Sequence, residues 1–100
     1  MMLYSIVGID KPDSLEARMA VRSEHVARLN ELLEQGRLII AGPNPAIDSE
    51  DPGSAGFSGS IIIAEFDSLQ AAEDWAGDDP YIKSGAYASV MVKPFRKVLP

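Results

Sequence analysis

Four short segments with the composition of β-strands alternate along the chain with two longer amphipathic segments. The first segment, Met2–Ile9, reads MLYSIVGI and is followed by the turn cluster Asp10-Lys11-Pro12. Its residues favour an extended backbone, and apolar side chains occupy both alternating positions. Such a pattern is typical of a strand covered on both faces, so we predict a central strand over residues 2–9.

A long amphipathic helix is predicted from Asp13 to Gln35. Asp13 and Glu16 have the spacing of a capping box, which satisfies backbone N–H groups at a helix start. Helix-forming residues continue to Gln35, and Gly36 supplies the expected C-terminal stop. Apolar residues recur in this segment at helical spacing, interrupted only by the charged Arg22: Leu15, Met19, Val26, Leu29 and Leu33.

The next two strands are separated by a long loop. Leu38–Ala41 is predicted as a short strand that ends at Gly42-Pro43, and Ser60–Phe66 as a third strand. Between them, Asn44–Ser58 holds further prolines, glycines and acidic residues. Loops of this length in a small domain are usually functional or mobile.

A second helix and a single helical turn precede the last strand. Asp67 or Ser68 is expected to cap a helix that ends at Ala76-Gly77 and buries Leu69, Ala72 and Trp75. Asp79 precedes a proline, which is favoured at the first helical position, and therefore predicts a short turn that ends near Gly85.

The fourth strand is predicted over Tyr87–Val92, with Pro94 as its break. The tail Phe95–Leu99 is basic and apolar, and it either extends this strand or packs on a partner.

The element order β-α-β-β-α-β predicts an α+β, ferredoxin-like fold for a single domain over residues 1–100. In this arrangement both helices cover one face of a four-stranded antiparallel sheet. The first and third strands are apolar on both alternating positions, so the other face must also be covered. Pairing of two chains through these sheet faces is the simplest cover, and we predict a homodimer.

Composition and charge narrow the function classes. Nine basic against 15 acidic residues give a formal charge of −6, which argues against a nucleic-acid partner but not against a small anionic ligand. The absence of cysteine excludes disulfides and thiolate metal sites. No leader is expected, because the first residues already form a strand, and no apolar run reaches the roughly 18 residues that span a membrane. We therefore expect a cytoplasmic protein without a membrane partner.

His25, the single histidine, is the strongest candidate for chemistry. An imidazole exchanges protons near neutral pH, and a carboxylate partner fixes its tautomer. In the predicted fold the turn after the second helix returns towards the first helix, which makes Asp79 the expected partner and Asp78 the second choice. A partly exposed helix histidine without a role is the alternative interpretation.

Basic and backbone-restricting residues close to His25 are candidate substrate contacts. Arg18 and Arg22 lie one turn apart and could grip an anion, or they could pair with acidic residues of the protein. Gly42-Pro43 suits a pocket rim, although a simple strand exit explains it equally well.

Aromatic side chains and metal ligands add little to this picture. Trp75, Tyr81 and Tyr87 are expected in the core or an interface, with Tyr81 also a candidate substrate contact. One histidine and no cysteine predict neither an intrachain metal site nor a cofactor, leaving open a site that a dimer partner completes.

Four groups of residues in order along nearly the whole chain resemble the YciI-like (YCII-related) family, in particular its small bacterial branch, which has an insertion like Asn44–Phe57. They are Arg18-x-x-x-Arg22-x-x-His25, Gly36-Arg37-Leu38 with Ala41-Gly42-Pro43, Asp79-Pro80-Tyr81 with Gly85, and Val92-Lys93-Pro94-Phe95. The resemblance implies a ferredoxin-like domain assembled as a dimeric α/β barrel. It also implies an active site centred on a histidine and an aspartate, which match His25 and Asp79.

Three hypotheses for function follow. The first is acid/base chemistry of a lyase or isomerase type, since a more distant relative of the family is a dehydrochlorinase and the wider group includes muconolactone isomerases. Here His25 transfers protons, Asp79 orients it, and Arg22 and Arg18 hold an anionic oxygen. The second is hydrolysis by the same pair. The third is a ligand-binding or accessory dimer without catalysis.

Overall fold

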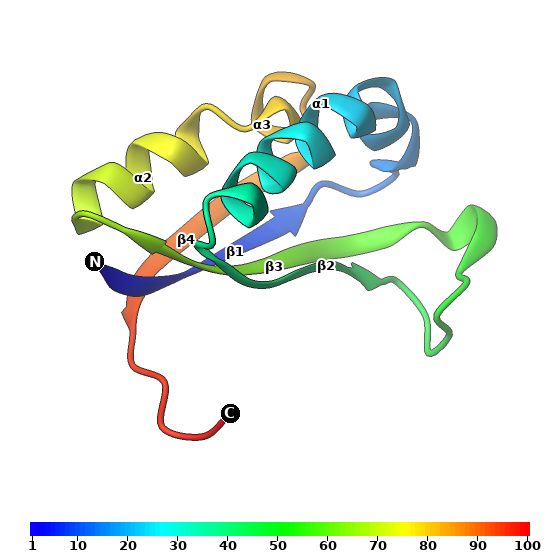
Figure 1. Cartoon of the computed structure of the whole chain (residues 1–100). Coiled ribbons are helices and arrows are strands. Elements are labelled where there is room, and N and C mark those ends of the chain that lie inside the picture. Colours follow the sequence, from blue (N-terminus) through cyan, green and yellow to red (C-terminus); the bar gives the residue numbers. More distant parts are fainter.

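The computed structural model describes residues 1–100 and contains a four-stranded sheet, three α-helices and one 3₁₀ turn. Figure 1 shows the helices together on one face of the sheet and the C-terminal tail on the other side. The elements in chain order are β1 (Met2–Asp10), α1 (Leu15–Glu34), β2 (Leu38–Pro45), the turn η1 (Gly53–Ala55), β3 (Phe57–Phe66), α2 (Leu69–Gly77), α3 (Pro80–Lys83) and β4 (Tyr87–Phe95).

The sheet has the strand order β2-β3-β1-β4, and all neighbouring strands are antiparallel. The predicted ferredoxin-like arrangement and the central place of the first strand are therefore confirmed. In this register Ile6 of β1 lies opposite Ile62 of β3 and Val92 of β4, and these three side chains share the helix-covered face. The central strands are thus covered by the helices on one face, as their apolar pattern requires.

Both edge strands are longer than predicted. The predicted strand exit at Gly42-Pro43 is wrong, because β2 continues to Pro45 and Pro43 lies opposite Ser60. The predicted break at Pro94 is also wrong, because β4 continues to Phe95. Proline lacks an N–H group, which excludes it from central strands, but an edge strand pairs on one side only and tolerates it.

The start of α1 differs from the predicted capping box. The helix begins at Leu15, and Asp13 precedes it with a φ of 56°. Ser14 occupies the N-cap but makes no capping hydrogen bond, since its hydroxyl donates to the Asp10 carboxylate at 2.5 Å. The capping box of Asp13 and Glu16 is therefore wrong, because the residue at the cap is engaged with the end of β1. The stop at Gly36 is confirmed by its φ of 71°.

The inward face of α1 carries polar side chains rather than the predicted apolar stripe. Arg18, His25 and Leu32 are the buried residues of the helix, whereas Met19 is 64% and Leu33 58% exposed. The helix is rotated about its axis relative to the predicted orientation, because Arg18 and His25 have buried partners. The apolar pattern alone does not reveal these partners. Between these two residues, the backbone leaves helical geometry at Val21 (φ −130°, ψ 15°).

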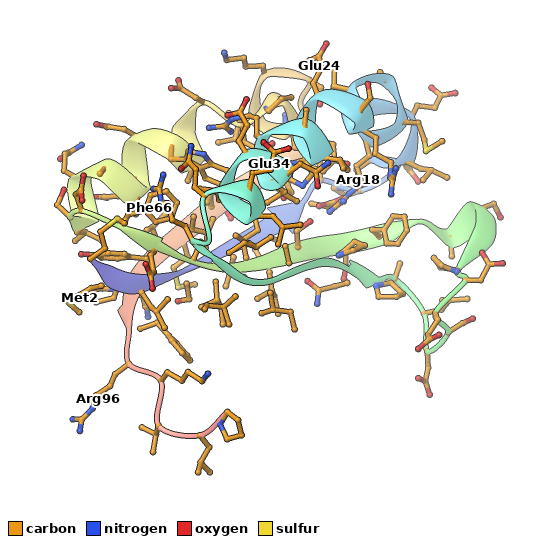
Figure 2. All side chains as sticks on the ribbon, viewed as in Figure 1. Met2, Arg18, Glu24, Glu34, Phe66 and Arg96 are labelled. Carbon is orange, nitrogen blue, oxygen red and sulfur yellow. The ribbon has the colours of Figure 1, made fainter.

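The two later helices start as predicted. The Ser68 hydroxyl accepts a hydrogen bond from the Ala71 N–H at 3.0 Å, and the Asp79 carboxylate caps α3. Leu69, expected in the core, is instead 40% exposed. The main core between α1, α2 and the sheet consists of Tyr4, Ile6, Leu32, Ile62, Ala64, Phe66, Ala72 and Ala76. Figure 2 shows Phe66 between the sheet and the helices and Arg96 on the tail, away from them.

The sheet face opposite the helices is apolar and exposed. Register places alternate residues of all four strands on this face, and they include Ile9, Ile40, Ile61, Met91 and Phe95, with exposed fractions between 36% and 61%. The register also places Ser5, Glu65 and Lys93 on this face, between the apolar residues. An exposed face that is rich in apolar residues is characteristic of an interaction site. No helix of the chain has both the length and the apolar character needed to cross a membrane.

Gly8 of β1 and Gly59 of β3 lie next to each other in the sheet and allow these two central strands to pack closely. A Cβ on Gly59 would overlap the carbonyl oxygen of Gly8, which is backbone and has no room to move. We predict that Gly59→Ala lowers the free energy of unfolding by on the order of 3 kcal/mol, measured by urea denaturation. Gly77→Ala is the matched control, because a Cβ there meets nothing within 4 Å and should leave stability equal or higher. Equal stability of the two variants would contradict this account of the packing.

Candidate functional site

His25 and Asp79, the two residues expected to form a pair, are in contact in the structure. The imidazole Nδ1 lies 2.9 Å from Oδ1 and 3.0 Å from Oδ2 of Asp79, and both residues are almost fully buried. Asp79 Oδ1 also accepts a hydrogen bond from the Tyr81 N–H at 2.9 Å. The same carboxylate thus caps α3 and holds the imidazole, so the short helix fixes the orientation of the pair.

The second imidazole nitrogen of His25, Nε2, opens into a cavity. Nε2 makes no hydrogen bond within the chain, and the one buried side-chain nitrogen without a partner belongs to Arg28. Nε2 is therefore accessible, and His25 is among the residues that line a cavity between α1 and the sheet. A carboxylate can only accept hydrogen bonds, so Nδ1 carries a proton, and in that tautomer of the imidazole Nε2 presents its lone pair.

Tyr81 packs flat against the imidazole and completes its surroundings. The ring centroids of Tyr81 and His25 are 4.0 Å apart at an interplanar angle of 15°, and the Arg18 guanidinium lies 4.8 Å over the Tyr81 ring. Burial raises the pKa of the Tyr81 phenol, and the nearby charges of Arg18 and Arg22 only partly oppose this effect. Tyr81 is therefore a neutral ring that holds His25 in place.

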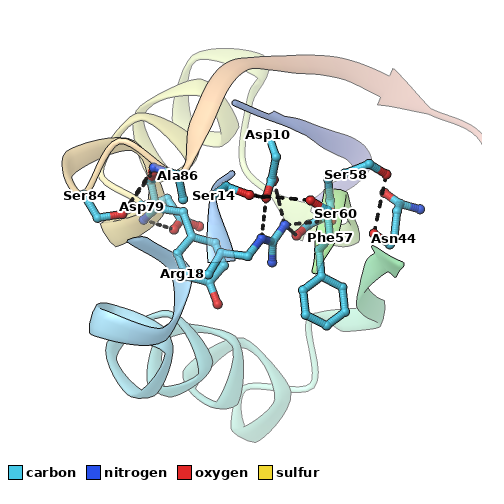
Figure 3. Close-up of polar contacts among 12 residues, drawn as sticks. Asp10, Ser14, Arg18, Asn44, Phe57, Ser58, Ser60, Asp79, Ser84 and Ala86 are labelled. Carbon is cyan, nitrogen blue, oxygen red and sulfur yellow. Dashed lines mark hydrogen bonds and ion pairs between the residues drawn. The ribbon is translucent and has the colours of Figure 1, made fainter. Parts of the chain in front are cut away.

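Arg18 is largely occupied by partners of the protein. Its Nε and Nη2 donate to the Asp10 carboxylate at 2.6 and 2.8 Å, and Nη2 also reaches the Gly59 carbonyl and the Ser60 hydroxyl. Figure 3 shows the guanidinium between Asp10 and Ser60. Burial opposes the charge of Arg18, but the hydrogen bonds and charge of Asp10 outweigh it and raise its pKa.

Arg18 therefore has one nitrogen left for a ligand. Arg18 was expected to bind an anion through two nitrogens, but only Nη1 is available for this. Nη1 has no partner in the chain and is not a buried atom. Arg22 is exposed and makes no hydrogen bond or ion pair with the protein, so its whole charge is available at the cavity.

The cavity beside His25 has a volume of about 470 Å³, within the range of small-molecule sites. Leu15, Met19, Val26 and Leu29 of the apolar stripe form one wall, and of these four only Leu29 also packs against the main core. Gly42 and Pro43 of β2 lie on the opposite wall, although as strand residues rather than a strand exit. The lining residues are Leu15, Arg18, Met19, Arg22, His25, Val26, Leu29, Ala41, Gly42, Pro43, Phe57, Ser60, Ile62 and Tyr81.

Sequence reasoning missed Asp10 and Arg28. The sequence pattern assigns Asp10 to a turn, and nothing in its spacing reveals its ion pair with Arg18. Arg28 was detectable, because Arg18, His25, Arg28 and Leu32 recur at spacings of seven, three and four, which is a second helical face. Its Nη1 lies 3.9 Å from Asp79 Oδ2, and its guanidinium packs 4.2 Å over the Trp75 ring.

The arrangement is suited to proton transfer next to a bound anion. An oriented imidazole with an accessible nitrogen can accept and return a proton, and two cationic groups at the cavity can stabilise negative charge that develops on an oxygen. No three side chains of histidine, aspartate or glutamate are grouped as metal ligands would be.

Comparison with known proteins agrees with this architecture. The family profile of the YCII-related domain matches residues 2–96. Protein YciI of Escherichia coli is 60% identical over 97 residues, and an uncharacterized protein of Haemophilus influenzae is 58% identical over 97 residues. Each alignment covers 97% of this chain and 99% of the relative.

A solved structure with a similar fold is the 5-chloro-2-hydroxyhydroquinone dehydrochlorinase of Burkholderia phenoliruptrix in complex with 2,5-dihydroxybenzoquinone. It superimposes with a TM-score of 0.82 at 26% sequence identity, over 95% of this chain and 94% of that one. An antibiotic biosynthesis monooxygenase superimposes with a TM-score of 0.51 at 11% identity, which shows a shared fold alone.

The buried phenol of Tyr87, which packs against Tyr81, makes the free energy of unfolding depend on pH in the alkaline range. Burial raises its pKa from 10.0 to about 12. The neutral phenol therefore stabilises the fold fully below pH 10, and this contribution, on the order of 2 kcal/mol, is lost as pH rises through about 12. We predict that the free energy of unfolding falls less steeply between pH 10 and 12 in Tyr87→Phe than in the wild type, measured by urea denaturation. Identical slopes would contradict the buried neutral phenol.

Proposed function

Because this chain belongs to the YCII-related domain family, we propose that it is a small enzyme that performs acid/base chemistry on a small anionic substrate. His25 transfers the proton at Nε2, and Asp79 holds the imidazole through Nδ1. The observation that carries the proposal is this single oriented imidazole: one nitrogen is fixed by a buried carboxylate and the other faces a cavity of about 470 Å³.

The walls of the cavity match a compact, acidic molecule with an apolar body. Leu15, Val26 and Leu29 supply apolar contact on one side, and Phe57 supplies an aromatic ring. Arg22 carries an unpaired charge at the cavity and can bind a carboxylate or an acidic hydroxyl. The substrate thus places its oxygen near Arg22 and its reacting carbon near His25.

A lyase-type step fits these groups. A proton of the substrate, on an acidic hydroxyl or on a carbon next to a carbonyl group, moves to Nε2 of His25. The electron pair left behind forms a new C=O or C=C bond, and a leaving group on a saturated carbon in conjugation with it departs with its own bonding pair. Negative charge that develops on the substrate oxygen is stabilised by Arg22 and by Nη1 of Arg18. His25 then returns its proton to solvent or to the product.

The dehydrochlorinase likeness supports this class of reaction. Loss of hydrogen chloride from a hydroxylated ring is an elimination in which a base removes a proton and chloride leaves. The shared architecture extends over almost the whole of both chains, although the two sequences are only 26% identical. A ring with acidic hydroxyl groups is therefore a suitable probe for this cavity.

The functional unit is a homodimer in this proposal. The apolar sheet face of Ile9, Ile40, Ile61, Met91 and Phe95 is too hydrophobic to remain in water, and a second copy of the chain offers a surface of the same kind. A cytoplasmic location also belongs to the proposal.

Substitution of the His25–Asp79 pair tests the chemistry. With 5-chloro-2-hydroxyhydroquinone as the probe, we predict chloride release that falls by about 10²- to 10⁴-fold in His25→Ala. Asp79→Asn should lower it by at least about tenfold, because an amide no longer fixes the required tautomer. Asp78→Asn is the matched control, since this neighbouring carboxylate is exposed and makes no side-chain hydrogen bond, and it should retain full activity. Unchanged chloride release in His25→Ala would contradict the mechanism.

A charge on the outer sheet face tests the assembly. We predict that Ile61→Lys converts a dimer to a monomer, measured by light scattering across a concentration series, because an ammonium group cannot be buried there without a partner. Leu33→Lys is the control, since Leu33 is also an exposed apolar residue, at 58% against 41% for Ile61, but lies on α1 and not on this face. A wild-type chain that is monomeric at all concentrations, or an Ile61→Lys dimer, would refute the arrangement.

A further inference from the structure

Arg28 lies beside the His25–Asp79 pair, and nothing in the proposed proton transfer uses it. It is three residues after His25 on α1 and therefore lies on the same face of the helix, one turn further along. Its Nη2 donates to the Trp75 carbonyl at 2.6 Å, and its guanidinium packs over the Trp75 ring. These two contacts hold the group at the C-terminal part of α2, and Arg28 is not among the residues that line the cavity.

The second terminal nitrogen of the Arg28 guanidinium, Nη1, faces the Asp79 carboxylate. Nη1 is 3.9 Å from Asp79 Oδ2 and is fully buried without a hydrogen-bond partner. A buried N–H group without a partner is costly, so its position needs an explanation. The ionic attraction to Asp79 is the interaction that compensates for it, at a distance where two opposite charges in a buried setting attract strongly.

The positive charge of Arg28 decides how many protons the pair holds at rest. Arg28, ionised Asp79 and neutral His25 together carry no net charge. Protonation of His25 would give these three groups a net positive charge, and the side chains of His25 and Asp79 are nearly fully buried while that of Arg28 is 21% exposed. Such a charge is unfavourable without a second carboxylate. Asp79 is the only acidic residue that contacts either partner.

We infer that Arg28 is a positioning residue that keeps His25 neutral at rest, so that Nε2 first acts as a proton acceptor rather than as a donor. The inference deepens the proposed function, since it assigns the direction of the first proton transfer. The effect of Arg28 on the protonation of His25 can be measured without a substrate.

The other positive charges near the His25–Asp79 pair act on the charge of the imidazole more weakly than Arg28 does. The Arg18 charge is compensated by Asp10, and Arg22 is exposed, so water screens it. The titratable or charged residues that face the pair are Arg18, Arg22 and Arg28 of α1, Asp79 and Tyr81 at the start of α3, and Tyr87 of β4.

The experiment is an NMR titration of the imidazole, whose signals are unambiguous because the chain has a single histidine. We expect the midpoint of the titration in Arg28→Met to lie at least about half a pH unit above that of the wild type. Arg28→Lys keeps the charge and should restore most of the wild-type midpoint. A midpoint in Arg28→Met equal to the wild-type value would overturn the inference, as would equal shifts in Arg28→Met and Arg28→Lys, which would indicate packing rather than charge.

Arg37→Met is the matched control. Arg37 also packs its guanidinium over an aromatic ring, 5.1 Å from the centroid of Phe66, and also donates to a backbone carbonyl, that of Glu65 at 3.0 Å. It makes no contact with the pair, so its removal should leave the His25 midpoint unchanged. An equal shift in Arg37→Met would show a general loss of positive charge and overturn the inference.

A measurement on the wild-type chain covers the case in which Arg28→Met does not fold. The Nε–Hε resonance of Arg28 should change with pH at the same midpoint as the imidazole, because both groups share Asp79. A resonance that stays constant across the His25 titration would overturn the inference. This result is separable from a failure of the proposed enzyme activity, which would show as unchanged chloride release in His25→Ala while the two titrations remain linked.

Discussion

The ion pair between Asp10 and Arg18 is the interaction on which the position of the site depends. It joins the last residue of β1 to the first turns of α1, and Arg18 continues to the Gly59 carbonyl and the Ser60 hydroxyl of β3. Both charged side chains are buried, so loss of one would leave an uncompensated charge at a cost of about 3–5 kcal/mol. The pair thereby fixes the rotation of α1, and His25 follows two helical turns later on the same face.

This rotation has a consequence for the cavity. A helix of a small domain normally turns its apolar side chains inward, but α1 uses its inward face for Arg18, His25, Arg28 and Leu32. Its apolar stripe is displaced to the side, where Leu15, Met19, Val26 and Leu29 form a cavity wall. The buried polar network and the cavity therefore both depend on the rotation of α1 about its axis. Packing of α1 with its apolar stripe against the sheet would remove both.

The sequence predicted the order of elements, the central first strand and the caps at Ser68 and Asp79, because local patterns and turn chemistry determine them. The partnership of His25 and Asp79 followed from the topology, which returns the turn before α3 to α1. The rotation of α1 could not be predicted from its pattern, since Asp10 and Arg18 attract each other only after folding brings them together. The lengths of β2 and β4 were underestimated because prolines end central strands but not edge strands.

Those prolines also limit how copies of the molecule can associate. An exposed strand edge is a template for another strand, which is the usual beginning of open-ended aggregation. Here β2 carries Pro43 and Pro45, and β4 carries Pro94, so each edge lacks donors that an added strand would need. Growth of the sheet from edge to edge is interrupted on both sides. In the proposed dimer the chains associate instead through the flat sheet face, and a contact of that kind closes after two copies.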